Sequence, residues 1–89
     1  MKKNEIIKDR LEEWVESKGF LSSRFTIIEL CKIIGINRTY LSNYINSTYG
    51  LNFNLWINHL RIEEAKLLMG QTPKRSLSEI AERIGFTDL

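Results

Sequence analysis

The chain has 89 residues, a formal net charge of +2 at pH 7 and a pI of about 8.8, and this length suits one domain. Its one cysteine and one histidine exclude an internal disulfide and the usual zinc-binding patterns. No apolar run approaches the roughly 18 residues of a membrane span, and the mixed charge near the N-terminus does not fit a secretory signal. We therefore expect a cytoplasmic protein with no membrane contact from this segment, no metal and no cofactor.

Helical spacing of the apolar residues predicts an all-α chain, and a composition with one proline and five glycines favours long helices. The first helix is expected over about residues 3–18. Its apolar face consists of Ile7, Leu11, Trp14 and Val15. Gly19 follows this face, and we expect it to serve as the C-terminal cap.

A second helix is expected to begin after Thr26, because Thr26 and Glu29 have the spacing of a capping box. Its end is expected at Gly35, which opens a short turn. Asn37 is a good N-cap for a third helix over about residues 38–48. Two helices joined by a short turn that contains glycine are typical of a helix-turn-helix unit.

A long helix is expected over about residues 53–69, with Asn52 as its N-cap. One apolar face of this helix consists of Phe53, Trp56, Ile57, Leu60 and Leu68. A second apolar strip consists of Leu55, Ile62, Ala65 and Met69. A helix that is apolar on two sides is usually packed on two sides, so we expect this helix to join two units.

Residues 77–86 repeat residues 27–36 at a constant offset of 50, with three identities among the ten aligned positions. Ser76 repeats the N-cap of the earlier segment. A helix-turn-helix crossing needs a small residue four positions before the turn glycine, where the chain has Cys31 and Ala81. We therefore expect the start of a second helix-turn-helix unit, whose next helix would lie beyond residue 89.

The third helix carries polar side chains on the face opposite its apolar stripe. These candidate DNA-binding residues are Arg38, Thr39, Ser42, Asn43 and Asn46. The second helix of such a pair enters the major groove, where arginine can bridge the two acceptors of guanine and asparagine can pair with adenine. The alternative is that the same residues form a solvated helix face.

The stretch from residue 26 to residue 86 resembles the DNA-binding domain of AraC/XylS-type transcription regulators. The matching motifs are residues 37–42 (Asn-Arg-Thr-Tyr-Leu-Ser), 50–53 (Gly-Leu-Asn-Phe), 56–68 (Trp-Ile-Asn-His-Leu-Arg-Ile-Glu-Glu-Ala-Lys-Leu-Leu) and 78–86 (Ser-Glu-Ile-Ala-Glu-Arg-Ile-Gly-Phe). The resemblance implies two helix-turn-helix units joined by a long helix. It also implies that the helix over 38–48 is the first recognition helix and that Arg61 is structural. Family members usually have bulkier or more basic residues at positions 42, 43 and 46, which implies weaker binding here.

We interpret residues 1–89 as a single DNA-binding domain fragment. Its parts are an N-terminal helix and loop (1–24), a first helix-turn-helix (25–50), a linker helix (52–70) and an incomplete second helix-turn-helix (76–89). The expected function is sequence-specific binding of double-stranded DNA for transcription regulation, with a sensor or effector domain elsewhere in a longer protein.

The alternative function is a protein–protein interaction or self-association module. It would use an exposed apolar face of the unfinished second unit, made of Ile80, Ile84 and Phe86. An enzyme is not expected, because the sequence has no recognisable catalytic nucleophile–base pair and no phosphate-binding glycine loop.

Overall fold

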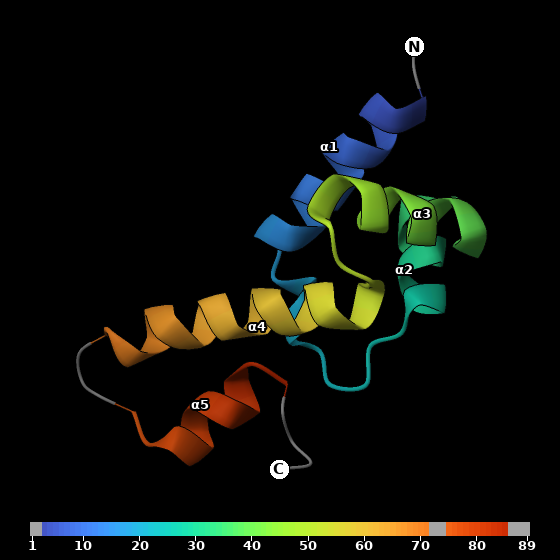
Figure 1. Ribbon diagram of the computed structural model, residues 1–89. Coiled ribbons are helices and arrows are strands. Elements are labelled where there is room, and N and C mark those ends of the chain that lie inside the picture. The colour runs from blue at the N-terminus through green and yellow to red at the C-terminus, as the bar shows by residue number, and fades with distance from the viewer. Residues whose placement is uncertain (1–2, 72–74, 86–89) are drawn as a thin grey trace.

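The computed structural model describes residues 3–71 and 75–85, and these residues form helices and connecting turns without strands (Figure 1). The elements are α1 (Lys3–Glu16), the short 3₁₀ helix η1 (Gly19–Leu21), α2 (Ile27–Ile34), α3 (Arg38–Tyr49), α4 (Phe53–Met69) and α5 (Leu77–Arg83). The first three α-helices gather near the N-terminal half of α4, and α5 lies against its C-terminal half (Figure 1). The predicted all-α class is confirmed, and no helix of the described part is long and apolar enough to cross a membrane.

The helix boundaries follow local capping chemistry. The Thr26 side chain accepts a hydrogen bond from the Glu29 amide at 3.2 Å, and Glu29 Oε1 accepts one from the Thr26 amide at 3.2 Å, which confirms the predicted capping box. Gly35 ends α2 at a φ of 86°, a left-handed conformation that favours glycine. Asn37 then accepts a hydrogen bond from the Tyr40 amide at 2.8 Å and caps α3 as predicted.

The end of the first helix differs from the prediction. Helix α1 ends at Glu16, and Lys18, at a φ of 62°, provides the left-handed turn that had been expected at Gly19. Gly19 instead begins η1, where an added Cβ would lie 2.2 Å from Nε1 of Trp14. This glycine is therefore needed because the backbone passes directly against the indole ring, which is a contact that helix periodicity does not reveal.

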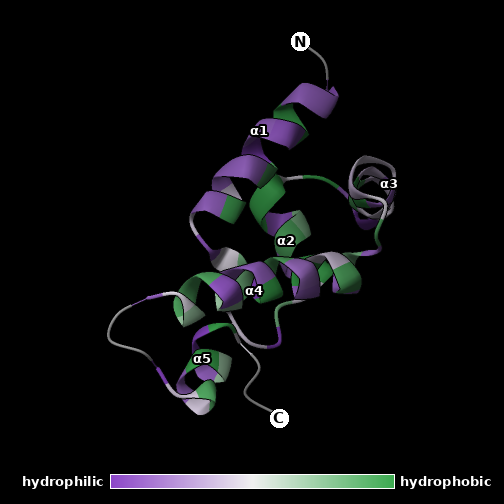
Figure 2. Cartoon of the chain, turned by 60° about the vertical axis from the view of Figure 1, so that its left-hand side comes forward, coloured by the Kyte–Doolittle hydropathy of each residue, from purple (hydrophilic) through white to green (hydrophobic). Residues whose placement is uncertain are grey.

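The main core lies between the first three helices and the N-terminal half of α4. Its buried residues are Ile7, Leu11, Trp14, Phe20, Leu30, Cys31, Ile34, Leu41, Ile45, Phe53, Trp56 and Ile57. Figure 2 shows α1 as mainly hydrophilic with separate hydrophobic bands, as expected for a helix that buries one face. The expected core roles of Trp14 and Trp56 are confirmed, and their ring centroids lie 5.9 Å apart.

The linker helix α4 packs mainly through its first apolar face. Leu68 near its C-terminus forms a second, smaller core with Ile80 and Ile84, and Leu21 and Ala65 pack against this cluster. The second apolar strip is largely uncovered, because Leu55, Ile62 and Met69 are 53%, 49% and 48% exposed. The prediction that both sides of α4 would be packed is therefore wrong for Leu55, Ile62 and Met69, whereas Ala65, the fourth member of the strip, packs against the second core.

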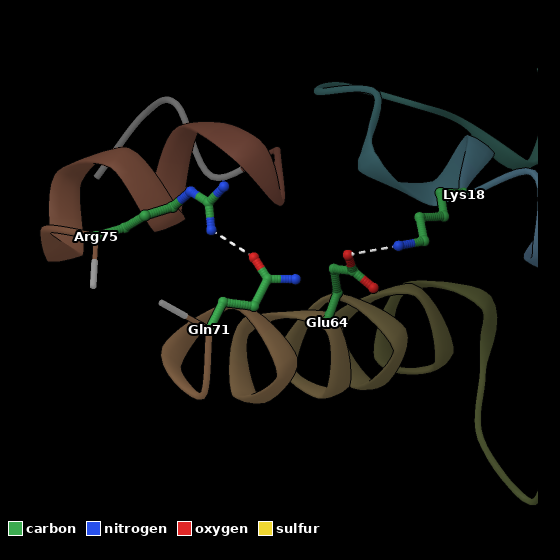
Figure 3. A network of polar contacts seen from close by, with 4 residues as sticks. All are labelled: Lys18, Glu64, Gln71 and Arg75. Carbon is green, nitrogen blue, oxygen red and sulfur yellow. Dashed lines mark hydrogen bonds and ion pairs between the residues drawn. The ribbon is translucent and has the colours of Figure 1, made fainter. Parts of the chain in front are cut away.

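Two buried charged side chains connect α4 to the segment between α1 and α2. Arg61 Nε donates to the Phe20 carbonyl and Arg61 Nη2 donates to the Ser22 carbonyl, each at 2.8 Å. Glu64 forms an ion pair with Lys18 at 2.9 Å (Figure 3). Burial lowers the pKa of Arg61, although an arginine stays protonated at neutral pH. These contacts give Arg61 the structural role that the family resemblance implies.

The start of the second unit docks onto the same arginine. Gly85 has a φ of 90°, and an added Cβ would lie 2.7 Å from the Leu21 carbonyl and 3.3 Å from the Arg61 guanidinium carbon. Only glycine satisfies both the left-handed backbone and this close approach. Arg61 therefore lies between the η1 segment and the turn of the second unit, so that one side chain contacts both units.

Candidate nucleic-acid interface

The turn between α2 and α3 holds the two helices in a helix-turn-helix arrangement. The Cys31 carbonyl accepts hydrogen bonds from the Gly35 amide at 2.7 Å and the Ile36 amide at 3.2 Å. Cys31 itself is buried, as expected for the small residue at the crossing. Arg10 Nη1 on α1 donates to the Ile34 carbonyl at 2.6 Å, so α1 closes the C-terminal end of α2. Sequence reasoning missed this contact, because it depends on how α1 packs.

Helix α3 presents one polar face and buries the other. Leu41 and Ile45 are 0% exposed and fix the rotation of the helix. All five candidate residues lie within about 140° of the helix circumference, given 3.6 residues per turn. Arg38, Thr39, Asn43 and Asn46 are exposed, and Ser42 is half-buried. The structure therefore brings the whole predicted set together on one accessible surface, which we call the α3 polar face.

One edge of the α3 polar face borders a groove of about 410 Å³. The groove is lined by Arg38 and Ser42 together with Phe25, Thr26 and Ile27 at the start of α2 and Asn52, Phe53 and Asn54 at the start of α4. Two helix N-termini thus lie beside a cationic side chain. The helix dipoles, and the first amides that the Thr26 and Asn52 caps do not engage, favour negative charge. The Glu29 carboxylate already lies at the start of α2 as part of its capping box, so this edge suits an anionic partner mainly through Arg38 and the start of α4. The sequence contains the cap signals, but not the convergence of the two helix starts.

The opposite edge of the α3 polar face meets the first turn of α1. Tyr40 Oη donates to Asn4 Oδ1 at 2.7 Å, and Lys3 Nζ lies 4.3 Å from the centroid of the Tyr40 ring. Asn4, Tyr40, Asn43, Tyr44 and Ser47 line a shallow hollow of about 220 Å³. Asn43 of the polar face therefore shares a surface with α1, which sequence reasoning did not anticipate because the two segments are far apart in the chain.

The second unit is described as far as Gly85. Ser76 caps α5 by accepting a hydrogen bond from the Glu79 amide at 3.1 Å, as predicted. Arg75 donates to Gln71 and so bridges the loop between α4 and α5 (Figure 3). Among residues 3–71 and 75–85, no three histidine, cysteine, aspartate or glutamate side chains gather closely enough to hold a metal ion.

The apolar face expected to drive self-association is not exposed. Ile80 and Ile84 are buried against Leu68 of α4 and cannot offer a free surface. Phe86, the third member of that set, lies outside the described residues. The prediction that this face is uncovered is therefore wrong for both described members, because α5 folds back onto α4.

Comparison with known proteins supports the class that the fold indicates, a helix-turn-helix protein. Residues 30–89 match a family model described as a helix-turn-helix domain, which is more than half of the chain. The structure is also similar to the crystal structure of the C-terminal domain of the two-component response regulator YesN from Fusobacterium nucleatum. Sequence identity is 31%, the match covers 91% of this chain and 83% of that chain, and the TM-score is 0.75. No curated protein matches the chain.

The chain therefore belongs to the AraC-type helix-turn-helix family, whose members bind DNA in transcription regulation. This assignment agrees with the resemblance inferred from the sequence motifs.

Proposed function

We propose that the chain is a sequence-specific reader of double-stranded DNA in a transcription regulator, and that α3 enters the major groove. The observation that carries this proposal is the α3 polar face, in which four polar side chains are exposed and Ser42 is half-buried beside them, while Leu41 and Ile45 are fully buried. A sensor or effector domain elsewhere in a longer protein would control when this reader acts.

The dimensions of α3 suit the proposed position. An α-helix with its side chains is about 10–12 Å across, and the major groove is about 12 Å wide. Thr39, Ser42 and Asn43 are short and allow the helix to approach the base edges closely. Arg38 at the start of α3 has the reach to bridge guanine acceptors, and Asn43 has the amide needed to pair with adenine. The mechanism is binding alone, without covalent chemistry on the DNA.

The groove beside Arg38 supports a backbone contact on the same side. Residues at the starts of α2 and α4 line this groove with Arg38 and Ser42. Helix N-termini accept phosphate through their free amides, and such contacts fix the register of a reader without specifying sequence. The base-facing and phosphate-facing groups would thus lie on adjoining parts of one surface.

We expect Arg38→Ala and Asn43→Ala each to lower binding to a selected site by about 1–3 kcal/mol and to relax base preference at one position. The site would first be selected from a random duplex pool with the unaltered chain, and each variant would then be titrated against single-base variants of that site.

Matched control variants lie on α4. Lys66→Ala removes one exposed positive charge and Asn58→Ala removes one exposed amide, and neither residue belongs to the α3 polar face or lines the groove beside Arg38. The controls should bind and discriminate as the unaltered chain does. Equal behaviour of the α3 variants and these controls would contradict the placement of α3 in the groove.

A second candidate function is self-association through a different surface from the one first expected. Leu55, Ile62 and Met69 are spaced by seven residues and form an exposed strip along α4, the pattern of a helix-pairing seam. Sedimentation of the chain at increasing concentration distinguishes the two functions, because a dimer that is lost in Ile62→Glu supports this candidate and a monomer at all concentrations eliminates it.

A further inference from the structure

The first turn of α1 borders the α3 polar face directly. Asn4 accepts the Tyr40 hydroxyl hydrogen bond at 2.7 Å and shares a hollow with Asn43. Tyr40 is only half-buried, so this junction lies at the surface. A ligand that covers the Asn43 side of α3 would therefore also lie next to the start of α1.

Lys3 places a positive charge at this junction. Its Nζ lies 4.3 Å from the Tyr40 ring centroid, within the range at which a cation is attracted to an aromatic face. This contact holds the lysine stem near α3, while the Lys3 side chain as a whole remains exposed. The ammonium group is thus positioned at the edge of the polar face and is accessible to an anion.

Acidic residues on α1 do not share this position. Glu5 and Asp9 lie about 160° and 120° around the helix from Lys3, given 3.6 residues per turn. Both are exposed and lie on other sides of α1 than Lys3, whose ammonium group contacts the Tyr40 ring. The charge that faces the α3 side of this turn is therefore the positive charge of Lys3.

The two edges of the α3 polar face have the same electrostatic character. One edge carries Arg38 and the starts of α2 and α4, and the other carries Lys3 and the start of α1. A helix that fills the major groove places its two flanks opposite the two phosphate backbones. Cationic groups on both flanks of α3 fit that geometry. A helix face that contacts only solvent would need no such arrangement of charges.

We propose that the first turn of α1, through Lys3, is a second contact surface for the DNA phosphate backbone, on the flank of α3 opposite Arg38. This inference rests on the proposed function, and it adds a non-specific contact that fixes the orientation of α3. Lys3 neutralises one phosphate and releases a counterion in doing so.

The test is a titration of the full chain with a selected duplex by fluorescence anisotropy over a series of monovalent salt concentrations. Loss of one phosphate contact in Lys3→Ala should reduce the slope of log affinity against log salt by about 0.9. The same relation gives about eightfold weaker binding at 0.1 M salt, converging with the unaltered chain towards 1 M. Base preference should not change, because phosphate contacts carry no sequence information.

Two further variants separate the contact from a structural effect. Lys66→Ala removes an equivalent charge from α4 and should leave the slope unchanged. Tyr40→Phe removes the bond to Asn4 but keeps the ring beneath Lys3, and it should also keep the slope. Circular dichroism on each variant establishes that the fold is intact.

The outcomes distinguish this inference from the proposed function. If the unaltered chain binds DNA and Lys3→Ala shows the same salt slope, the α1 contact is wrong while DNA binding by α3 stands. If the unaltered chain binds no duplex from a random pool, the proposed function and this inference both fail.

Discussion

Replacing Arg61 with alanine is expected to lower the free energy of unfolding by about 3 kcal/mol or more. The change removes two charge-assisted hydrogen bonds, to the Phe20 and Ser22 carbonyls, and leaves these acceptors without that donor. It also removes the group against which Gly85 packs. Urea unfolding followed by circular dichroism measures the loss, and hydrogen exchange should show that the amides of α5 lose protection before those of α2.

Two further variants serve as comparisons for the stability of Arg61→Ala. Arg83→Ala removes an exposed arginine from α5 and should change stability little. Arg61→Lys keeps the charge but lacks the planar fork that reaches two carbonyls at once, so its stability should lie between those of the alanine variant and the unaltered chain. Equal stability of Arg61→Ala and Arg83→Ala would show that Arg61 does not join the two units.

Replacing Trp56 with alanine is expected to cost about 3–5 kcal/mol. Trp56 is 3% exposed, and its ring packs against Trp14, Tyr49 and Phe53 at centroid distances of 5.9, 5.0 and 6.5 Å. Burial raises the pKa of the Tyr49 hydroxyl, and the nearby Tyr44 and Glu12 raise it further. The phenol that stacks on Trp56 is therefore uncharged at neutral pH. A chain of this length has a total stability of about 4–13 kcal/mol at 0.05–0.15 kcal/mol per residue, so this loss is a large fraction of the total and the urea midpoint should fall well below that of the unaltered chain.

The matched control for Trp56 lies on the same helix. His59→Ala changes an exposed residue of α4 and should leave the urea midpoint nearly unchanged. Trp56→Phe retains part of the aromatic contact, so its urea midpoint should lie between those of Trp56→Ala and His59→Ala. A cooperative transition for Trp56→Ala at the midpoint of the unaltered chain would show that the aromatic cluster contributes little to the core.

Features that depend on local sequence could be predicted. The caps at Thr26, Asn37 and Asn52 were predicted correctly because each side chain satisfies a backbone amide three residues away. The α3 polar face was predicted as a set for a similar reason, since helical periodicity alone decides which side chains share a face with one another.

Features that depend on tertiary packing could not be predicted. Gly19 looked like a helix cap, and only the position of Trp14 shows why a side chain is excluded there. Periodicity found the second apolar strip of α4 but not whether another helix covers it. The two edges of the α3 polar face were missed, because the contact between Lys3 and Tyr40 joins segments that lie far apart in the sequence.

The central claim is that α3 binds DNA through its polar face, and a nuclear magnetic resonance titration of the nitrogen-15-labelled chain with a selected duplex tests it most directly. The account predicts that the largest amide shifts fall on residues 38–46, with smaller shifts at the starts of α1, α2 and α4. The exposed strip of Leu55, Ile62 and Met69 should remain unperturbed. Shifts confined to that strip, or an α3 that does not respond when the duplex is in excess, would contradict the account.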